Sequence, residues 1–285
     1  MSKPIYRTLI ASHELRELVQ ARAPDLLIVD AGFDLADTEA GTRAHAQGHL
    51  PGAHYLHLDR DLSGAKTGAN GRHPLPERGA FAARMAALGL SPKTQVVAYD
   101  AQGGMYAARL WWMLRWLGHE AVAVLDGGLA AWVAAGGSLV TEPTPAPRPS
   151  GFVPGPTLAP SLDADALQAQ LGRVRLIDAR AGERFRGEIE PLDARAGHIP
   201  GASNRFFKDN LRADGCFKSA DTLRAEFAPL LAPYAAEAVV HQCGSGVTAC
   251  HNLLAMEVAG LAGSQLYPGS WSEWSSDPAR PVAQG

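Results

Sequence analysis

The residues best suited to chemistry form one short run, residues 243–248 (CGSGVT), between an apolar segment and a helical pattern. A glycine-rich loop at such a place can curl so that several main-chain N–H groups point inward. The first turn of the following helix adds unpaired N–H groups and a partial positive charge. A cysteine at the mouth of this nest is stabilised as a thiolate, so Cys243 is the predicted nucleophile. The loop residues predicted to bind an anionic substrate are Gly244, Gly246, Val247 and Thr248.

The alternative for Cys243 is a structural role, because a cysteine beside a glycine turn is often only a small buried residue. Its position between a strand and a helix favours catalysis, since open α/β sheets bind ligands at the carboxyl ends of their strands. The other two cysteines receive no catalytic role. Cys250 lies among apolar residues of the predicted helix and is expected in the core, and Cys216 lies in a polar stretch.

Phosphoryl transfer is a competing chemistry for this loop. Cysteine-dependent phosphatases use a similar strand, loop and helix, and they close the loop with an arginine at the position of Ala249. That arginine pairs in a bidentate manner with the phosphate dianion. Because the side chain here is a methyl group, the sequence disfavours a phosphatase.

Short apolar runs and helical patterns alternate around this loop. Residues 95–99 and 238–242 have the length of strands and are rich in valine. Each is followed by a loop and a helical pattern, over 106–117 and 248–258. This alternation predicts an α/β fold with parallel sheets flanked by helices.

The order of these segments repeats along the chain. The matched pairs are residues 27–31 and 176–179, 48–53 and 197–202, 96–100 and 239–243, and 127–132 and 269–274. The offset of about 142 to 149 residues indicates duplicated domains, because solenoid repeats span only roughly 20 to 50 residues. The first half has Asp100 where the second has the cysteine, so the first half is predicted to be catalytically inactive.

A proline-rich segment separates the two halves. Seven prolines lie between Pro143 and Pro160 without apolar periodicity, which is typical of a semi-rigid linker. We therefore expect a non-catalytic domain over residues 1–142, a linker over 143–160 and a catalytic domain over 161–285.

Composition narrows the range of partners. A net charge of −3 without a long run of like charge argues against a nucleic-acid or membrane surface. The sequence has no apolar run of about 18 residues, so no transmembrane helix is expected. Residues 1–12 lack the apolar stretch of a signal peptide. Three cysteines without a disulfide framework fit a reducing cytoplasm.

Four histidines lie close together in the first half and suggest a metal site: His45, His49, His54 and His57. We reject this interpretation, because His49 recurs as His198 in the second half and therefore looks like an element of the fold. The segment also lacks a cysteine or carboxylate at a spacing that would complete a tetrahedral set. Neither a metal nor a cofactor is expected.

The loop at Cys243, the two GH(L/I)PG segments and the ending at Trp274 together resemble the tandem-domain rhodanese superfamily over nearly the whole chain. The loop is similar to that of 3-mercaptopyruvate sulfurtransferases. Thiosulfate sulfurtransferases usually carry basic residues where this chain has Gly244 and Ser245. The resemblance implies two tandem rhodanese-like domains and a sulfurtransferase that works through a Cys243 persulfide.

The implied donor is 3-mercaptopyruvate, and the implied acceptor is a thiol, such as that of reduced thioredoxin, or cyanide. Two alternatives remain open. One is a thiosulfate:cyanide sulfurtransferase, and the other is a non-catalytic persulfide carrier that another protein loads.

Ser245 is similar to a loop serine that the family groups with an aspartate and a histidine. Asp59 and His73 stand at the positions of these partners. The resemblance therefore implies a relay that protonates the pyruvate enolate as the C–S bond breaks. From the sequence alone, Asp59 fits an acid in a turn and His73 a solvated loop residue.

Arg184 matches a family arginine that binds the carboxylate of the substrate. The family's second arginine lies nine residues further on, where this chain has Asp193. Arg195 is the predicted replacement and Arg186 is the alternative, although both also fit ordinary surface charges. Pro268 stands where the family often has aspartate, and we expect only a local effect.

Overall fold

The computed structural model describes residues 5–285, and the chain divides into two compact units. The first unit holds residues up to Ser63, Pro76–Leu158 and Ala213–Cys216, and the second holds Gly64–Leu75, Ala159–Arg212 and Phe217–Gly285. Two short segments thus belong to the unit opposite to their place in the sequence. The domain boundaries predicted at residues 142 and 161 do not include either of these two segments.

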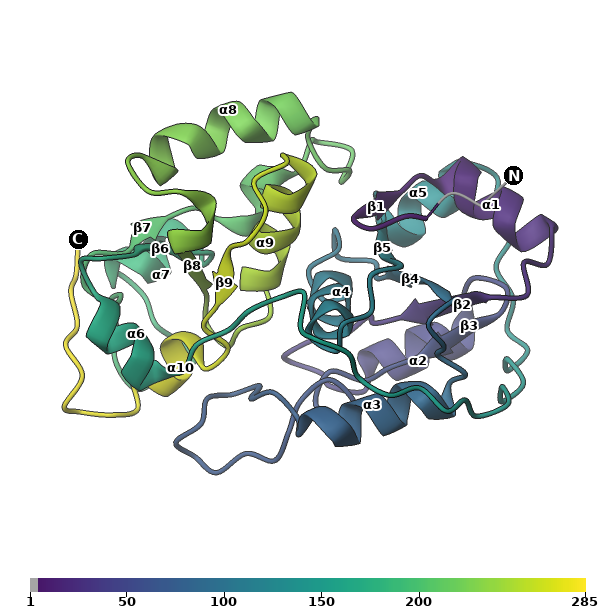
Figure 1. Cartoon of the computed structure of the whole chain (residues 1–285), viewed down its shortest axis with the longest axis horizontal. Helices are drawn as coiled ribbons and strands as arrows, with labels where there is room; N and C mark the ends of the chain where they lie inside the picture. The colour runs from purple at the N-terminus through teal and green to yellow at the C-terminus, as the bar shows by residue number, and fades with distance from the viewer. Residues whose placement is uncertain (1–4) are drawn as a thin grey trace. The chain divides into compact units, whose positions relative to one another are not determined.

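The first unit is built on a five-stranded parallel sheet with the order β1-β5-β4-β2-β3. Its strands are β1 (Leu9–Ile10), β2 (Leu26–Asp30), β3 (Ala53–Tyr55), β4 (Gln95–Tyr99) and β5 (Val122–Leu125). Its helices are α1 (Ser12–Gln20), α2 (Ala40–Gln47), α3 (Arg78–Ala87), α4 (Ala107–Trp116) and α5 (Gly128–Ala134). Figure 1 shows these elements by label.

The second unit is built on a four-stranded parallel sheet with the order β7-β6-β8-β9. Its strands are β6 (Arg175–Asp178), β7 (Ser203–Asn204), β8 (Val239–Gln242) and β9 (Gln265–Leu266). Its helices are α6 (Ala164–Gln170), α7 (Gly182–Arg186), η1 (Phe207–Asn210), α8 (Ala220–Leu231), η2 (Ala236–Ala238), α9 (Ala249–Val258) and α10 (Ser270–Trp274). Helices α8 and α9 lie on one side of the sheet and α6 and α10 on the other (Figure 1).

The duplication expected from the sequence is present in the topology. The order β5-β4-β2-β3 of the first unit corresponds strand by strand to β9-β8-β6-β7 of the second. Registers also correspond, because Asp30 lies beside Tyr99 in one sheet and Asp178 beside Gln242 in the other. A single parallel bridge between Ser161 and Leu266 takes the place of the β1–β5 pair. The predicted α/β fold with parallel sheets is confirmed.

The predicted elements around the two loops are found with small shifts. Strand β4 covers the predicted 95–99, whereas β8 begins one residue after the predicted 238 because Ala236–Ala238 forms a 3₁₀ turn. Helices α4 and α9 each begin and end within one residue of the predicted ranges. Both are buried along most of their length, which explains their apolar composition. None of the helices within residues 5–285 is long and apolar enough to cross a bilayer.

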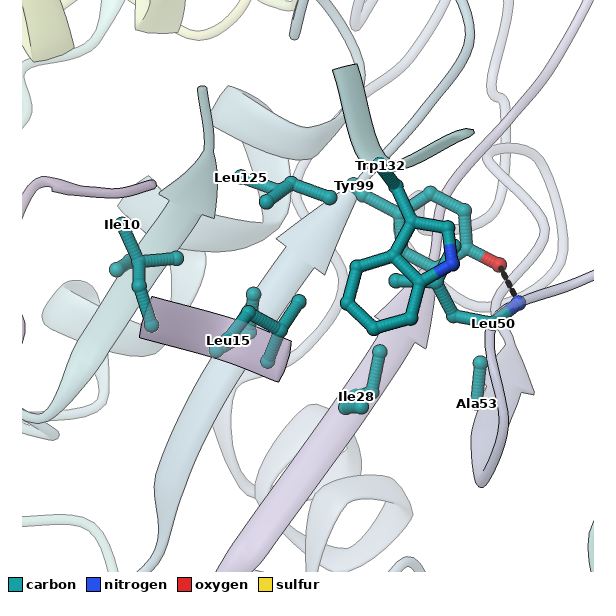
Figure 2. Packing of buried hydrophobic residues seen from close by; sticks show 10 residues of the cluster. Ile10, Leu15, Ile28, Leu50, Ala53, Tyr99, Leu125 and Trp132 are labelled. Atoms are coloured by element: carbon teal, nitrogen blue, oxygen red, sulfur yellow. Dashed lines mark hydrogen bonds between the residues drawn. The ribbon is translucent and has the colours of Figure 1, made fainter. Parts of the chain in front are cut away.

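Each sheet packs its own hydrophobic core. In the first unit, Leu15 of α1 and Trp132 of α5 pack on Ile28 and Tyr99 of the central strands (Figure 2). The Tyr99 hydroxyl accepts a hydrogen bond from the main-chain N–H of Leu50 at 3.3 Å. The core of the second unit is formed by Ala164, Leu167, Leu176, Ile199, Val240, Tyr267, Trp271 and Trp274. These cores fix the ends of the strands at which the two loops begin.

The proline-rich segment 143–160, which the sequence predicts to be a linker, contains no helix or strand. It is nevertheless held along the first unit by main-chain hydrogen bonds. Ser150 N–H donates to the carbonyl of Ala86 at 2.8 Å, and Gly155 N–H donates to that of Leu117 at 2.9 Å. The linker therefore joins the first unit as far as Leu158.

Candidate active site

Cys243 is the first residue after β8, one of the two central strands of the second unit's sheet. Its side chain is buried, with 1% of the residue exposed, and Ser245 and Val247 of the same loop are buried as well. Helix α9 begins at Ala249, directly after the loop. Cys250 is fully buried in the first turn of α9, as expected for a core residue.

The start of α10 holds the Cys243 loop from the side. The Ser270 hydroxyl accepts a hydrogen bond from the N–H of Cys243 at 3.1 Å. The N–H of Trp271 donates to the Cys243 carbonyl, and that of Ser272 to the Gly244 carbonyl, both at 2.9 Å. The segment 269–274, which matches residues 127–132 of the first half, therefore holds the Cys243 loop in place.

Gly246 allows the loop to curl. It has a φ of +76°, and a Cβ atom at this position would lie 2.2 Å from the carbonyl oxygen of Pro268. Only glycine fits such a position without displacing the backbone. Within residues 5–285, the N–H groups of Ser245, Val247 and Thr248 donate to no acceptor of the chain. The loop thus presents main-chain N–H groups that can donate hydrogen bonds to an anion.

The matching loop of the first unit shows how such donors are used. Both carboxylate oxygens of Asp100 accept main-chain hydrogen bonds, from Gln102, Gly104, Tyr106 and Ala107, at 2.8–3.0 Å. Asp100 is fully buried. Burial raises the pKa of its carboxyl, and the four N–H groups oppose that rise. In the first unit the nest is therefore occupied by the protein's own side chain.

His73 reaches the Cys243 loop from the segment Gly64–Leu75, which belongs to the second unit. The base of this segment is closed by a hydrogen bond from Gly64 N–H to the Pro74 carbonyl at 2.8 Å. His73 Nδ1 lies 2.7 Å from the Ser245 hydroxyl, and both residues are buried. The expectation of a solvated histidine is wrong, because this side chain is only 3% exposed.

Asp59 lies in the first unit, and its main-chain N–H donates to His57 Nδ1 at 3.1 Å. Its part in a relay with His73 stays a prediction.

Two arginines converge on Gly244. A Cβ atom at that position would lie 3.0 Å from Nη2 of Arg72 and 3.4 Å from Nη1 of Arg184. The carboxylate of Asp193 links the two guanidinium groups, with one oxygen 2.5 Å from Arg72 Nη1 and the other 3.0 Å from Arg184 Nη2. Arg184 therefore lies beside the loop, and Asp193 links it to a second cation, Arg72, that the sequence pattern did not single out.

The ion pairs continue away from the loop. Glu190 accepts from Arg184 at 2.6 Å and lies 3.3 Å from Arg180. Arg180 pairs with Asp178 at the end of β6, at 2.7 Å. Three arginines and three carboxylates thus form one largely buried network in which the formal charges cancel.

Arg195 does not point its guanidinium group at this cluster. Its nitrogens donate to four main-chain carbonyls near the C-terminus, those of Trp274, Ser275, Asp277 and Arg280. It therefore ties down the segment after α10. Arg186, the alternative, pairs with Glu188 on the surface.

Arg72 was missed because nothing in the sequence places residues 64–75 in the second unit. The only signal was its position next to His73. Gly71, which precedes it, has a φ of +83°, and a Cβ atom there would lie 2.8 Å from the Gly269 carbonyl oxygen. The segment is thus packed closely against the start of α10.

The histidines of the first unit have structural contacts. His45 Nδ1 lies 3.0 Å from the Asp30 carboxylate, and His49 Nδ1 lies 2.8 Å from the His45 carbonyl. His198 makes the equivalent contact with the carbonyl of Phe185 at 2.8 Å. Across the described residues, no three His, Cys, Asp or Glu side chains are grouped as metal ligands would be.

Comparison with known proteins agrees with the duplicated fold. The rhodanese-like domain family matches the chain twice, over residues 12–135 and 163–277. The chain belongs to the rhodanese family.

Relatives of this rhodanese are sulfurtransferases. It is 50% identical over 266 residues to a Pseudomonas aeruginosa protein named "Probable 3-mercaptopyruvate sulfurtransferase", covering 92% of this chain and 93% of the relative. It is 35% identical over 296 residues to the thiosulfate sulfurtransferase of Cricetulus griseus, covering 99% and 97% of the two chains. A solved structure of 3-mercaptopyruvate sulfurtransferase from Leishmania major aligns with a TM-score of 0.84 and 32% identity, covering 94% of this rhodanese and 74% of that chain. This rhodanese is accordingly a sulfurtransferase.

Proposed function

We propose that this rhodanese transfers a sulfur atom from 3-mercaptopyruvate to a thiol or to cyanide through a persulfide on Cys243. The observation that carries the proposal is the buried cysteine at the start of a loop with unused main-chain donors. The similarity to relatives named for 3-mercaptopyruvate supports the choice of donor.

In the first half of the reaction, the Cys243 thiolate attacks the sulfur of the donor. A new S–S bond forms, the C–S bond breaks, and its electron pair leaves with the three-carbon fragment as the enolate of pyruvate. Protonation of that enolate at its terminal carbon gives pyruvate. Cys243 then carries the transferred sulfur.

In the second half, an acceptor attacks the outer sulfur and regenerates the thiolate. A thiol becomes a persulfide, and cyanide becomes thiocyanate. A reduced thiol such as that of thioredoxin is the acceptor we propose, in a reducing cytoplasm in which cysteines stay unpaired. Within residues 5–285, no cysteine is joined in a disulfide.

The loop stabilises the sulfur anion. We propose that the N–H groups of Ser245, Val247 and Thr248 hold the anionic outer sulfur, with Gly244 and Gly246 providing the curl. The Asp100 carboxylate, which accepts four N–H bonds in the matching loop, supports this use.

Ser245, His73 and Asp59 are proposed to supply the proton. The 2.7 Å contact between the Ser245 hydroxyl and His73, beside the Cys243 loop, supports this role. Asp59 is proposed to orient His73, as in other carboxylate–histidine–hydroxyl systems. The substrate carboxylate is proposed to bind Arg184, whose guanidinium group lies against Gly244.

Thiosulfate remains the alternative donor because the family includes thiosulfate sulfurtransferases. The arginine network favours mercaptopyruvate as donor. Its three arginines are balanced by three carboxylates, so it has no net positive charge that would attract the thiosulfate dianion.

The test is turnover of both donors by the wild-type protein and by Cys243→Ser, with mass spectrometry of the persulfide. We expect higher kcat/KM for mercaptopyruvate, a mass increase of one sulfur, and complete loss of both in the variant. Cys216→Ser is the matched control and keeps full transfer. Persulfide formation without repeated turnover would instead identify a carrier.

A further inference from the structure

We infer that Arg72 is the second cation that binds the donor's carboxylate, and that Asp193 holds Arg72 and Arg184 at the spacing this requires. The inference rests on the proposed function, which supplies the carboxylate. It assigns a role to two residues that neither the sequence pattern nor the family resemblance singled out for it.

The free edges of both guanidinium groups face the loop. Arg72 Nη2 and Arg184 Nη1 lie nearest to the position that a Cβ atom of residue 244 would take, and in residues 5–285 neither atom makes a hydrogen bond or ion pair. The Nε atoms of both arginines are also buried without a partner. Two guanidinium groups thus offer unused N–H donors beside the loop that starts at the nucleophile.

Asp193 explains why two cations remain together. Its side chain is 3% exposed, and each of its oxygens pairs with one guanidinium group. Without that carboxylate the two positive charges would repel each other at close range. Asp193 uses Nη1 of Arg72 and Nη2 of Arg184, so the opposite nitrogens stay available to a second carboxylate.

The backbone fixes Arg72 on its other side. Its main-chain N–H donates to the Ser272 hydroxyl at 2.9 Å, and the N–H of Ser272 donates to the Gly244 carbonyl at 2.9 Å. One serine therefore connects Arg72 to the loop residue that its side chain contacts. The long side chain and planar guanidinium group of Arg72 allow it to bind a carboxylate in a bidentate or bridging geometry.

Glycine at position 244 is part of the same arrangement. A side chain there would meet both guanidinium groups, at 3.0 and 3.4 Å from its Cβ atom. Because residue 244 has no side chain, both guanidinium groups can reach the carboxylate of a donor bound at the loop.

The first experiment compares two donors that differ only in the carboxylate. 1-Mercaptopropan-2-one has a methyl group in place of the carboxylate of mercaptopyruvate. We expect Arg72→Ala to lower the ratio of kcat/KM for mercaptopyruvate over this ketone by roughly tenfold to a hundredfold, the loss typical of a charged hydrogen bond. The ketone reaction should fall far less than the mercaptopyruvate reaction, and a thermal unfolding curve like that of the wild type checks that the variant is folded. Arg60→Ala, which removes an exposed arginine of the first unit, is the control.

The second experiment separates this inference from the proposed reaction. Calorimetric titration of pyruvate into Cys243→Ser protein measures carboxylate binding without sulfur transfer. We expect Arg72→Ala in this background to weaken pyruvate binding by roughly the same factor. If wild-type protein fails to use mercaptopyruvate, the proposed function fails, and this titration still decides the role of Arg72. Equal pyruvate affinity with and without Arg72 overturns the inference.

Asp193→Ser tests the positioning role. We expect KM for mercaptopyruvate to rise while kcat for the ketone stays constant, and Asp193→Glu to restore part of the loss. A lower KM for mercaptopyruvate in Asp193→Ser would show that this carboxylate competes with the donor, and the positioning role would be wrong.

Discussion

The Ser245 hydroxyl lies 2.7 Å from Nδ1 of His73, although 172 positions separate the two residues in the chain. If this pair delivers the proton to the enolate, Ser245→Ala should slow the step that forms pyruvate by about a hundredfold or more, the usual contribution of a positioned acid. Sulfite leaves thiosulfate without protonation, so the thiosulfate reaction should change little. Single-turnover measurement of persulfide formation with each donor checks this.

His73→Gln is the second single variant of a double-mutant cycle with Ser245→Ala. Because the two side chains act through one hydrogen bond, the double variant should be no slower than the worse single variant. Additive losses, or equal losses for both donors, would remove the pair from the protonation step.

Arg184→Ala should raise KM for mercaptopyruvate by roughly tenfold to a hundredfold, because a charged hydrogen bond to its carboxylate is lost. The effect on thiosulfate should be far smaller, since that donor has no carboxylate. Steady-state kinetics with both donors gives the comparison. Arg186→Ala, two positions away and paired with Glu188 on the surface, separates the loss of this contact from a general loss of positive charge on α7. Equal losses for both donors in Arg184→Ala would exclude a carboxylate contact.

Gly246→Ala should destabilise the protein and abolish transfer. The residue has a φ of +76°, and the added Cβ would lie 2.2 Å from the Pro268 carbonyl oxygen. Gly201 is the matched control, because it has a φ of +81° and no atom within 4 Å of an added Cβ. Gly201→Ala should lose only the roughly 1–2 kcal/mol of a left-handed residue. Chemical denaturation of both variants measures the difference, and equal losses would mean that the loop tolerates the clash.

His241 makes the stability of the second unit dependent on pH. It is fully buried in β8, and burial lowers its pKa to about 3. The unfolded chain takes up a proton near pH 6.5 and the folded chain does not, so unfolding is favoured as pH falls from about 6.5 towards 3. Each pH unit in this range should remove about 1.4 kcal/mol of stability for this one group.

His241→Leu tests this dependence, since leucine cannot bind the proton. The unfolding free energy of the variant should fall less steeply between pH 6.5 and 4.5 than that of the wild type. The exposed His13→Ala on α1 is the control and should keep the wild-type slope. An unchanged slope in His241→Leu would contradict the assignment.

The strands and helices on either side of the two loops could be predicted from the sequence because their signals are local. Valine-rich runs marked β4 and β8, and long apolar patterns marked α4 and α9. The repeat added the tertiary information that both halves share one strand order. What local patterns cannot contain is a contact between distant segments.

The arginines show this limit. In the sequence, Arg184 and Arg195 both look like ordinary surface arginines. Only the packing of the folded chain decides that Arg184 lies beside Gly244 and that Arg195 binds main-chain carbonyls near the C-terminus. The position of Arg72 beside Gly244 could not be predicted, because it depends on residues 64–75 belonging to the second unit. Asp193 was noted only as a departure from the family, and it proved to be the bridge between two cations.

The passage of residues 64–75 into the second unit means that no single cut in the chain separates two complete modules. A fragment that starts in the linker would retain Cys243 and lack both His73 and Arg72. Gene fission or shuffling of the halves would therefore break the second unit even though its sheet is continuous. The first half of the sequence therefore carries a piece of the second unit that this unit needs to be complete.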